Sequence, residues 1–224
     1  MQSKGPFNLS SHRLDPLIDG IFAVALTVLV LEVKVPELEH PSSARELATA
    51  VAASAPLVIA YFVSFALLGL FWVWHHGLKD KVTRIDGALL SCTLAFLSLV
   101  CFFPFAAAVF GRYMIHGNLV ALLVYLPLVG LLLAIQLLYF YLAMRRGLVR
   151  EDLPAEQVAT SHRINLYSLA VFLLSCTPAA LILGIAAASA CLVCSALLAY
   201  AGMRYRSRAS VVAQALEPES PQAG

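Results

Sequence analysis

Residues 13–34 read RLDPLIDGIFAVALTVLVLEVK, and between Asp19 and Glu32 this stretch contains only glycine, threonine and apolar side chains. A helix needs about 20 mostly apolar residues to cross the hydrocarbon core of a bilayer. Lipid offers no partners for backbone N–H and C=O groups, so a spanning segment must pair them within the helix. The stretch therefore predicts a transmembrane helix over Leu14–Val33.

The whole chain has the same character, because 61% of its 224 residues are hydrophobic and 12% are charged. A typical soluble domain has about 25% charged residues. We predict an all-α integral membrane protein with six transmembrane helices in residues 1–208, followed by a disordered tail over 209–224. The predicted spans are Leu14–Val33, Leu47–Trp74, Ile85–Phe110, Leu119–Met144, Ile164–Leu183 and Ile185–Tyr205.

The basic residues predict the orientation of these spans. All but three of the 15 lysines and arginines fall in the N-terminal segment, in the loops after the second and fourth spans, or in the tail. Lysine and arginine accumulate in cytoplasmic loops. We therefore expect both termini in the cytoplasm, with Lys34, Arg45 and Arg112 on the opposite side.

Several signatures of catalysis and cofactor binding are missing from the sequence. It contains no phosphate-binding loop, no G-x-S-x-G elbow, no H-E-x-x-H helix and no TVGYG filter. The five cysteines all fall inside predicted spans, where cysteine behaves as a small apolar residue. We expect neither enzymatic activity nor a cofactor, and no nucleic-acid partner.

Asp19 is the residue in the first span that most needs a physical explanation. An acid within a span costs about 2.5 kcal/mol or more on insertion scales, so it normally faces the bundle, a partner or water. Arg13 lies six residues away, about 120° out of alignment on a helix, so a partner on another helix is favoured. Alternatively, Asp19 only pins the bundle near the cytoplasmic interface, with Pro16 in the first turn.

Beyond Asp19 the first span carries an apolar stripe. Val24, Thr27, Val28 and Leu31 recur at a spacing that places them along one helix face. By default such a stripe packs against protein or lipid. The small residues Gly20, Ala23 and Ala25 favour contact between helices over lipid exposure.

His75 and His76 end the second span beside Trp72 and Trp74. Adjacent helical residues point about 100° apart, which is poor geometry for shared metal ligation. We expect one imidazole to enter a buried polar cluster and the other to meet headgroups or the cytoplasm. The sequence leaves open which of the two does so.

The first span resembles the transmembrane-protein-175 family of cation channels, whose mark is an RxxxFSDG motif at the start of this helix. Here the motif reads RLDPLIDG, with Arg13, Asp19 and Gly20 at the family spacing. Leu17 and Ile18 replace its Phe and Ser, and the second change removes a hydroxyl group.

Three further patterns agree with the resemblance. The motif continues as IFAVALTVLVLEV, the second span contains W-x-x-H-H at Trp72, His75 and His76, and Pro104-Phe105 follows in the third. These patterns cover the first three helices. The remainder of the chain is similar to the family only in topology.

The resemblance implies an ion channel in which four copies surround a central pore lined by the first helix of each subunit. The constriction would fall at Val24, and Thr27 would supply a ring of hydroxyls one turn later. Val28 and Leu31 would widen the pore toward the outside. Such a hydrophobic constriction closes sterically or by dewetting.

The resemblance also assigns residues around the pore. Glu32 would ring the outer mouth with negative charge, or else pair with Lys34 or Arg45. The motif and the polar cluster behind the pore, which holds the first helix in register, would consist of Arg13, Asp19, Gly20, Trp72 and His75.

These features together predict a potassium-permeable homotetrameric channel in the bilayer of a prokaryotic plasma membrane, with the potassium ion as the permeant species. The alternatives are a small secondary transporter and an assembly protein without transport activity. Paired helices broken by glycine or proline, which many transporters carry in inverted repeats, are not evident. The channel interpretation is therefore preferred.

Overall fold

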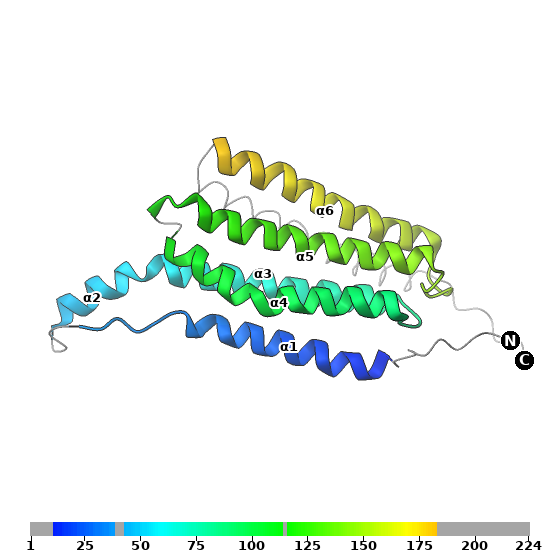
Figure 1. Ribbon diagram of the computed structural model, residues 1–224, viewed down its shortest axis with the longest axis horizontal. Coiled ribbons are helices and arrows are strands. Elements are labelled where there is room, and N and C mark those ends of the chain that lie inside the picture. The colour runs from blue at the N-terminus through cyan, green and yellow to red at the C-terminus, as the bar shows by residue number, and fades with distance from the viewer. Residues whose placement is uncertain (1–10, 39–42, 114–115, 183–224) are drawn as a thin grey trace, which may run out of the picture.

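The computed structural model describes residues 11–38, 43–113 and 116–182, and the named elements in these ranges are all α-helices (Figure 1). The predicted all-α class is confirmed. The helices are α1 (Ser11–Leu31), α2 (Ala44–Ala53), α3 (Ala55–Lys79), α4 (Gly87–Tyr113), α5 (Leu119–Arg145) and α6 (Ala155–Ile182).

Four helices in the described part of the chain are long and apolar enough to cross a membrane, and they match the first four predicted spans. Their spanning stretches are Leu14–Leu31, Ala55–Lys79, Gly87–Tyr113 and Leu119–Arg145. The fifth predicted span lies within α6 as far as Ile182. This helix begins earlier than predicted, at Ala155, with the polar stretch AEQVATSHR. The predicted sixth span and the tail lie outside the described residues.

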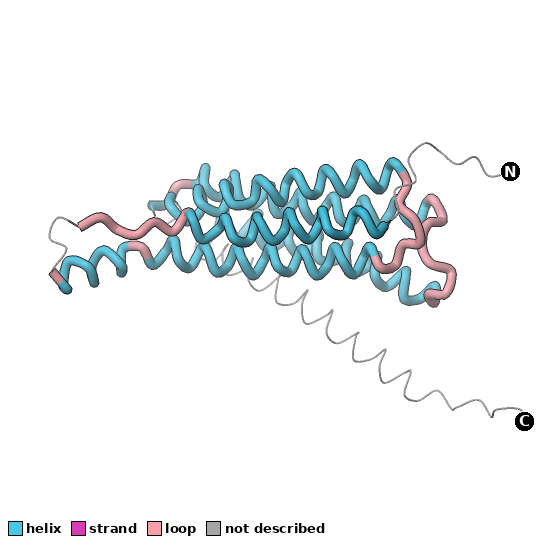
Figure 2. Tube along the Cα trace, turned by 90° about the horizontal axis from the view of Figure 1, so that it is seen from below, coloured by secondary structure: helices cyan, strands magenta, loops and turns pink. Residues whose placement is uncertain are grey.

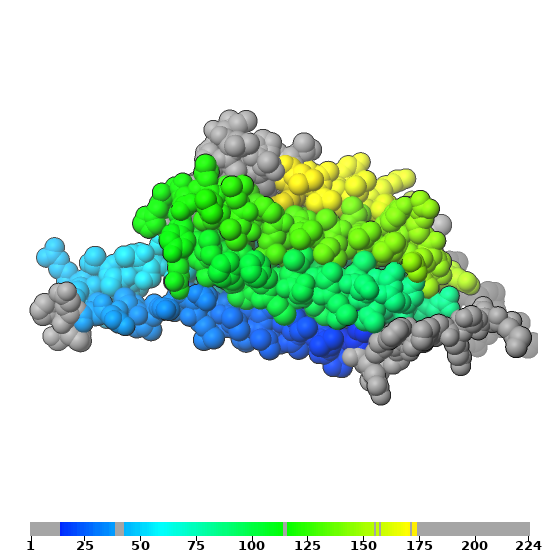
Figure 3. All heavy atoms as spheres, in the orientation of Figure 1, coloured from blue at the N-terminus to red at the C-terminus, as the bar shows by residue number. Residues whose placement is uncertain are grey.

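The second span differs from its prediction, because the structure divides Leu47–Trp74 between α2 and α3. Ser54 separates the two helices, and its N–H donates to the carbonyl oxygens of Ala50 and Val51. Pro56 explains the break, since proline lacks an N–H and its ring clashes with the carbonyl four residues earlier. As a result α2 buries none of its residues and projects beyond the other helices (Figures 2 and 3).

The long helices lie side by side, with α1 against α3 and α4, and α5 between α4 and α6 (Figure 1). Aromatic rings join these layers. Phe22 of α1 lies 5.9 Å from Phe96 of α4, measured between ring centroids, and Phe110 of α4 stacks on Tyr125 of α5 at 4.5 Å. The core of the subunit therefore runs between α1 and α5, through α4.

Gly111 marks a close approach between α3 and α4. A Cβ atom added there would lie 2.8 Å from Cδ1 of Leu57 and 2.9 Å from Cβ of Ala60. The Ala60 Cβ cannot rotate away, so any side chain at position 111 would push the helices apart. Small residues commonly permit such close contact between membrane helices.

The loops after α3 and α5 are joined at one end of the bundle. The Thr83 N–H donates to the Leu148 carbonyl over 2.8 Å, and the Arg150 N–H donates to the Lys81 carbonyl over 2.9 Å. Gly147 allows the chain to turn after α5 toward the loop that follows α3, because its φ of 61° lies in the left-handed region that favours glycine. The two loops thus fix the ends of α3 and α5 relative to each other.

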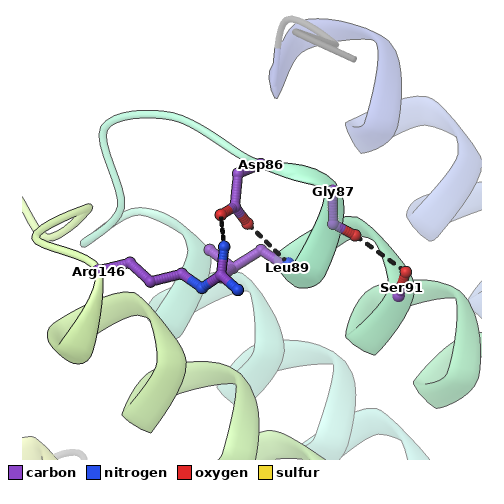
Figure 4. Close-up of polar contacts among 5 residues, drawn as sticks. All are labelled: Asp86, Gly87, Leu89, Ser91 and Arg146. Atoms are coloured by element: carbon purple, nitrogen blue, oxygen red, sulfur yellow. Dashed lines mark hydrogen bonds and ion pairs between the residues drawn. The ribbon is translucent and has the colours of Figure 1, made fainter. Parts of the chain in front are cut away.

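Asp86 connects the same loops at the start of α4 (Figure 4). Its Oδ1 accepts the Leu89 N–H over 3.0 Å, and its Oδ2 accepts the Arg146 guanidinium over 2.6 Å. Burial would raise the pKa of the Asp86 carboxyl, but these hydrogen bonds and the positive charge together lower it. Asp86 therefore stabilises the fold in its ionised form.

We expect Asp86→Asn to lower the free energy of unfolding at pH 7 by about 0.5–1 kcal/mol, because asparagine keeps the helix cap and loses only the charge. The folded pKa lies below the unfolded value of about 3.9. The stabilisation of the fold by the ionised Asp86 carboxylate is therefore fully present above the unfolded pKa and is lost as the pH falls through the folded pKa. Thermal unfolding in detergent between pH 7 and pH 3 measures this difference. Equal stability of the two proteins at pH 7 would contradict the assignment.

Candidate functional site

One face of α1 is buried against the subunit and the other is exposed. The buried face consists of residues that are each no more than 3% exposed: Leu14, Ile18, Phe22, Ala25 and Leu29. They recur every three or four residues, as expected for one side of a helix. The exposed face is also apolar, with Val24 at 61% exposure and Leu31 at 71%. A second apolar face on one helix requires something other than the subunit's own core to cover it.

The four residues of the predicted pore stripe do not all lie on this exposed face. Val24, Thr27 and Leu31 are exposed, whereas Val28 is half-buried toward α4. The Thr27 hydroxyl donates to the carbonyl oxygens of Ala23 (3.0 Å) and Val24 (2.8 Å). Its oxygen still has acceptor capacity on the exposed face.

A groove of about 410 Å³ runs between α1 and α4 beside this stripe. It is lined by Pro16, Leu17, Gly20, Ile21, Val24, Ala25, Val28, Cys101 and Pro104. A Cβ atom at Gly20 would meet nothing within 4 Å. Packing within the subunit therefore does not explain the glycine of the motif.

Asp19 has its partner on another helix, as the sequence favoured. The indole Nε1 of Trp72, on α3, donates to Asp19 Oδ1 over 2.8 Å. Trp72 is 39% exposed, and Asp19 also lies at the surface of the subunit. The contact joins α1 to α3 at the edge of the exposed face.

The two histidines occupy different environments. His75 is 1% exposed, and its ring stacks on Phe96 with 4.6 Å between centroids. Neither of its ring nitrogens has a hydrogen-bond partner among the residues that the structure describes. His76 is exposed, with its ring 6.0 Å from that of Trp72. The structure thus brings together Asp19 and Trp72 and places His75 in the aromatic core; Arg13 lies in the first turn of α1.

Sequence reasoning missed an ion pair near the start of α1. The Lys79 ammonium, at the last residue of α3, contacts the Asp15 carboxylate. The side chain of Lys79 is 8% exposed and that of Asp15 is 36% exposed. The sequence treated Lys79 as a loop residue because the second span was expected to end at Trp74. The longer α3 brings Lys79 into the bundle.

Glu32, at the other end of α1, also forms an ion pair, but its partner is neither of the two residues that the sequence suggested. Arg112 of α4 contacts its carboxylate over 3.0 Å, in place of Lys34 or Arg45. Both side chains of the pair are about two-fifths exposed, at 41% for Arg112 and 37% for Glu32. In the described ranges, no three histidine, cysteine or acidic side chains are grouped so as to hold a metal ion.

Comparison with known proteins relates this chain to a group of channels. Residues 13–104 match the family model described as the endosomal/lysosomal potassium channel TMEM175. A potassium channel of Streptomyces collinus is 37% identical over 164 residues, which cover 71% of this chain and 78% of that protein. A potassium channel of Chamaesiphon minutus is 34% identical over 137 residues, covering 61% and 66%.

A solved structure agrees with these sequence matches. It is the crystal structure of a lysosomal potassium-selective channel TMEM175 homolog from Chamaesiphon minutus, with a TM-score of 0.61 and 26% identity. The match covers 84% of this chain and 97% of that one. It therefore extends well beyond the three helices that carry recognisable motifs.

Proposed function

This chain belongs to the TMEM175 family of potassium channels, and on that premise we propose that it forms a potassium-permeable channel whose pathway is lined by α1. One observation carries the assignment of α1. This helix buries one face in its own subunit and presents a second apolar face, with Val24 61% exposed. A secondary transporter is the alternative.

The composition of the exposed face supports a pore more than a lipid-facing surface. Thr27, Gly20 and Ala23 lie on it among the larger apolar residues. Small residues and hydroxyls are enriched where membrane helices approach one another, and polar groups in a span favour protein or water over lipid. Four copies arranged about an axis would bring these faces together around the ions.

Within this arrangement the narrowest ring is formed by Val24. Thr27 follows within one turn and offers oxygen atoms to a partly dehydrated cation, and Leu31 lines the wider part beyond it, whereas the half-buried Val28 lies to the side, in the groove toward α4. A ring of valines excludes water when the pore is narrow, so conduction depends on wetting as well as on diameter. Because the sequence contains no TVGYG stretch, discrimination between cations in this arrangement falls to the rings formed by Val24 and Thr27.

The charge distribution supports a cytoplasmic location for the N-terminus, in a prokaryotic plasma membrane. The end of the bundle where α1 begins carries the basic residues Lys79, Lys81, Arg84, Arg145, Arg146 and Arg150 (Figure 1). The opposite end carries Lys34, Arg45 and Arg112. This asymmetry is the one expected from the preference of basic loops for the cytoplasm.

The direct test is an electrogenic flux assay with the purified protein in liposomes. We expect a potassium gradient alone to drive current, with a reversal potential that follows the potassium equilibrium potential. A flux that requires a second ion gradient would favour the transporter. Absence of current from correctly inserted protein would overturn the proposal.

We expect the pair of Glu32 and Arg112 to tune the charge at the outer mouth. Arg112→Gln leaves the Glu32 carboxylates unpaired, so potassium conductance at low ionic strength should rise by about twofold. Glu32→Gln should lower it, and both effects should fade in high salt because mobile ions screen exposed charges. Single-channel recording at two salt concentrations measures both effects. Arg150→Gln, at the opposite end of the bundle, is the matched control; an equal rise in that variant would contradict this role.

A further inference from the structure

The ion pair between Asp15 and Lys79 has no part in the ion pathway described above. Asp15 lies near the N-terminus of α1, and Lys79 is the last residue of α3. The Lys79 side chain is 8% exposed, so its ammonium group has lost most of its water. A buried cation is stable only when an anion and hydrogen bonds replace that water. The Asp15 carboxylate supplies the anion.

The position of Lys79 at the end of α3 strengthens the contact. The C-terminus of a helix carries a partial negative charge, and a cation in its last turn is stabilised. Asp15 lies just beyond the first turn of α1, so the dipole of that helix adds little to the contact. The antiparallel packing of α1 on α3 brings the end of α3 close to the start of α1.

Asp15 acts together with Asp19, one turn further along α1. Residues four apart lie on the same side of a helix. Asp15 contacts Lys79 and Asp19 contacts Trp72, so two successive turns of α1 are held by polar groups of α3. The buried face of α1, with Phe22 packed against Phe96, already excludes large rotations of the helix. The two directional polar contacts add to this packing a specific rotation of α1 about its own axis.

The rotation of α1 determines where Val24 points. Val24 follows Asp19 by five residues, which is about 140° around the helix. When Asp15 and Asp19 face α3, Val24 therefore faces away from it, in agreement with its 61% exposure. A change in rotation of one residue step would move Val24 by about 100°.

We propose that Asp15 and Lys79 form a positioning pair that sets the rotation of α1, and with it the direction of Val24. The inference rests on the proposed function, because it concerns the ring that Val24 forms in the channel. Neither residue of the pair touches the permeating ion. The pair acts only through the orientation of the helix.

The test compares Asp15→Asn, Lys79→Met and the exchanged double variant Asp15→Lys with Lys79→Asp. Two properties are measured in liposomes: potassium flux per inserted protein, and the rate at which a cationic thiol reagent modifies Val24→Cys in a cysteine-free background. We expect each single variant to lower the flux by about fivefold and to change the modification rate, while the exchange recovers both in part, to within about threefold of the parent, because the restored ion pair now opposes the dipole of α3. Restoration by exchange would not follow if each residue acted only through its size.

Arg150→Gln is the control, because Arg150 forms an exposed ion pair with Asp152 over 2.6 Å, in a loop remote from Val24. This variant should leave both properties unchanged. Inserted single variants with parental flux and modification rate would overturn the inference, as would an exchanged variant that fails to insert or to recover. If the parent itself conducts no potassium, the proposed function fails. The modification rates then still test the positioning pair by themselves.

Discussion

Tryptophan in place of Val24 is expected to reduce potassium flux by roughly two orders of magnitude, because an indole in each subunit would fill the narrowest ring of the pore. Val24 is 61% exposed on the subunit surface, so the larger side chain has room and does not disturb the core. Folding and insertion should therefore be unchanged. Flux into liposomes, normalised to inserted protein, measures the effect. The smaller variant Val24→Ala should conduct at least as well as the parent.

Val120→Trp provides the matched control for this experiment. Val120 is 63% exposed, close to the value for Val24, but it lies in the first turn of α5. The same change in size at this position should leave the flux near that of the parent. If both tryptophan variants lost flux equally, the loss would come from the added bulk and not from a blocked pathway. Normal flux through the Val24→Trp variant would show that α1 does not line the pore.

Asp19→Leu is expected to lower both subunit assembly and potassium flux by about tenfold. The change removes the acceptor for the Trp72 indole N–H, which is bonded over 2.8 Å. Trp72 is 39% exposed in the single subunit, so the unpaired indole donor would cost about 1–3 kcal/mol in each subunit only when assembly covers it. The fraction of intact oligomer in mild detergent and the flux in liposomes measure the two effects.

Two conservative variants separate the hydrogen bond from the charge of Asp19. Asp19→Asn keeps an oxygen that can accept the indole N–H, so it should retain most of the assembly. Trp72→Phe keeps an aromatic ring but removes the donor. Like Asp19→Leu it should release α1 from this contact with α3, but it leaves no unpaired indole N–H. Normal assembly and flux in Asp19→Leu would show that this contact does not hold α1.

Hydropathy was sufficient to locate the helices but not their breaks. The first four predicted spans correspond to α1, α3, α4 and α5. The error in the second span arose because its apolar residues continue across Ser54, whereas the local backbone effect of Pro56 ends one helix and starts the next. A separate error, the end of the second span at Trp74 instead of Lys79, placed Lys79 in a loop and so hid its contact with Asp15.

Candidate residues could be named from the sequence more readily than their partners. An acid in an apolar span drew attention to Asp19, and the periodic stripe drew attention to Val24. The choice between His75 and His76 stayed open, because two adjacent residues at the end of a helix have equal access to a core until the neighbouring helices are placed. The structure buries His75 against Phe96 of α4 but gives its ring nitrogens no hydrogen-bond partner among the described residues, so membership of a polar cluster stays a prediction.

The sequence by itself determined that the chain is built of apolar helices, that the first helix carries an acid and an apolar stripe, and that its motif resembles that of a channel family. These properties depend on composition and on periodicity along one segment. Only the tertiary structure decided that Asp15 meets Lys79, that Glu32 meets Arg112, and that Val24 faces outward. Such pairings depend on the relative rotation and height of separate helices, which are set by packing between segments distant in sequence.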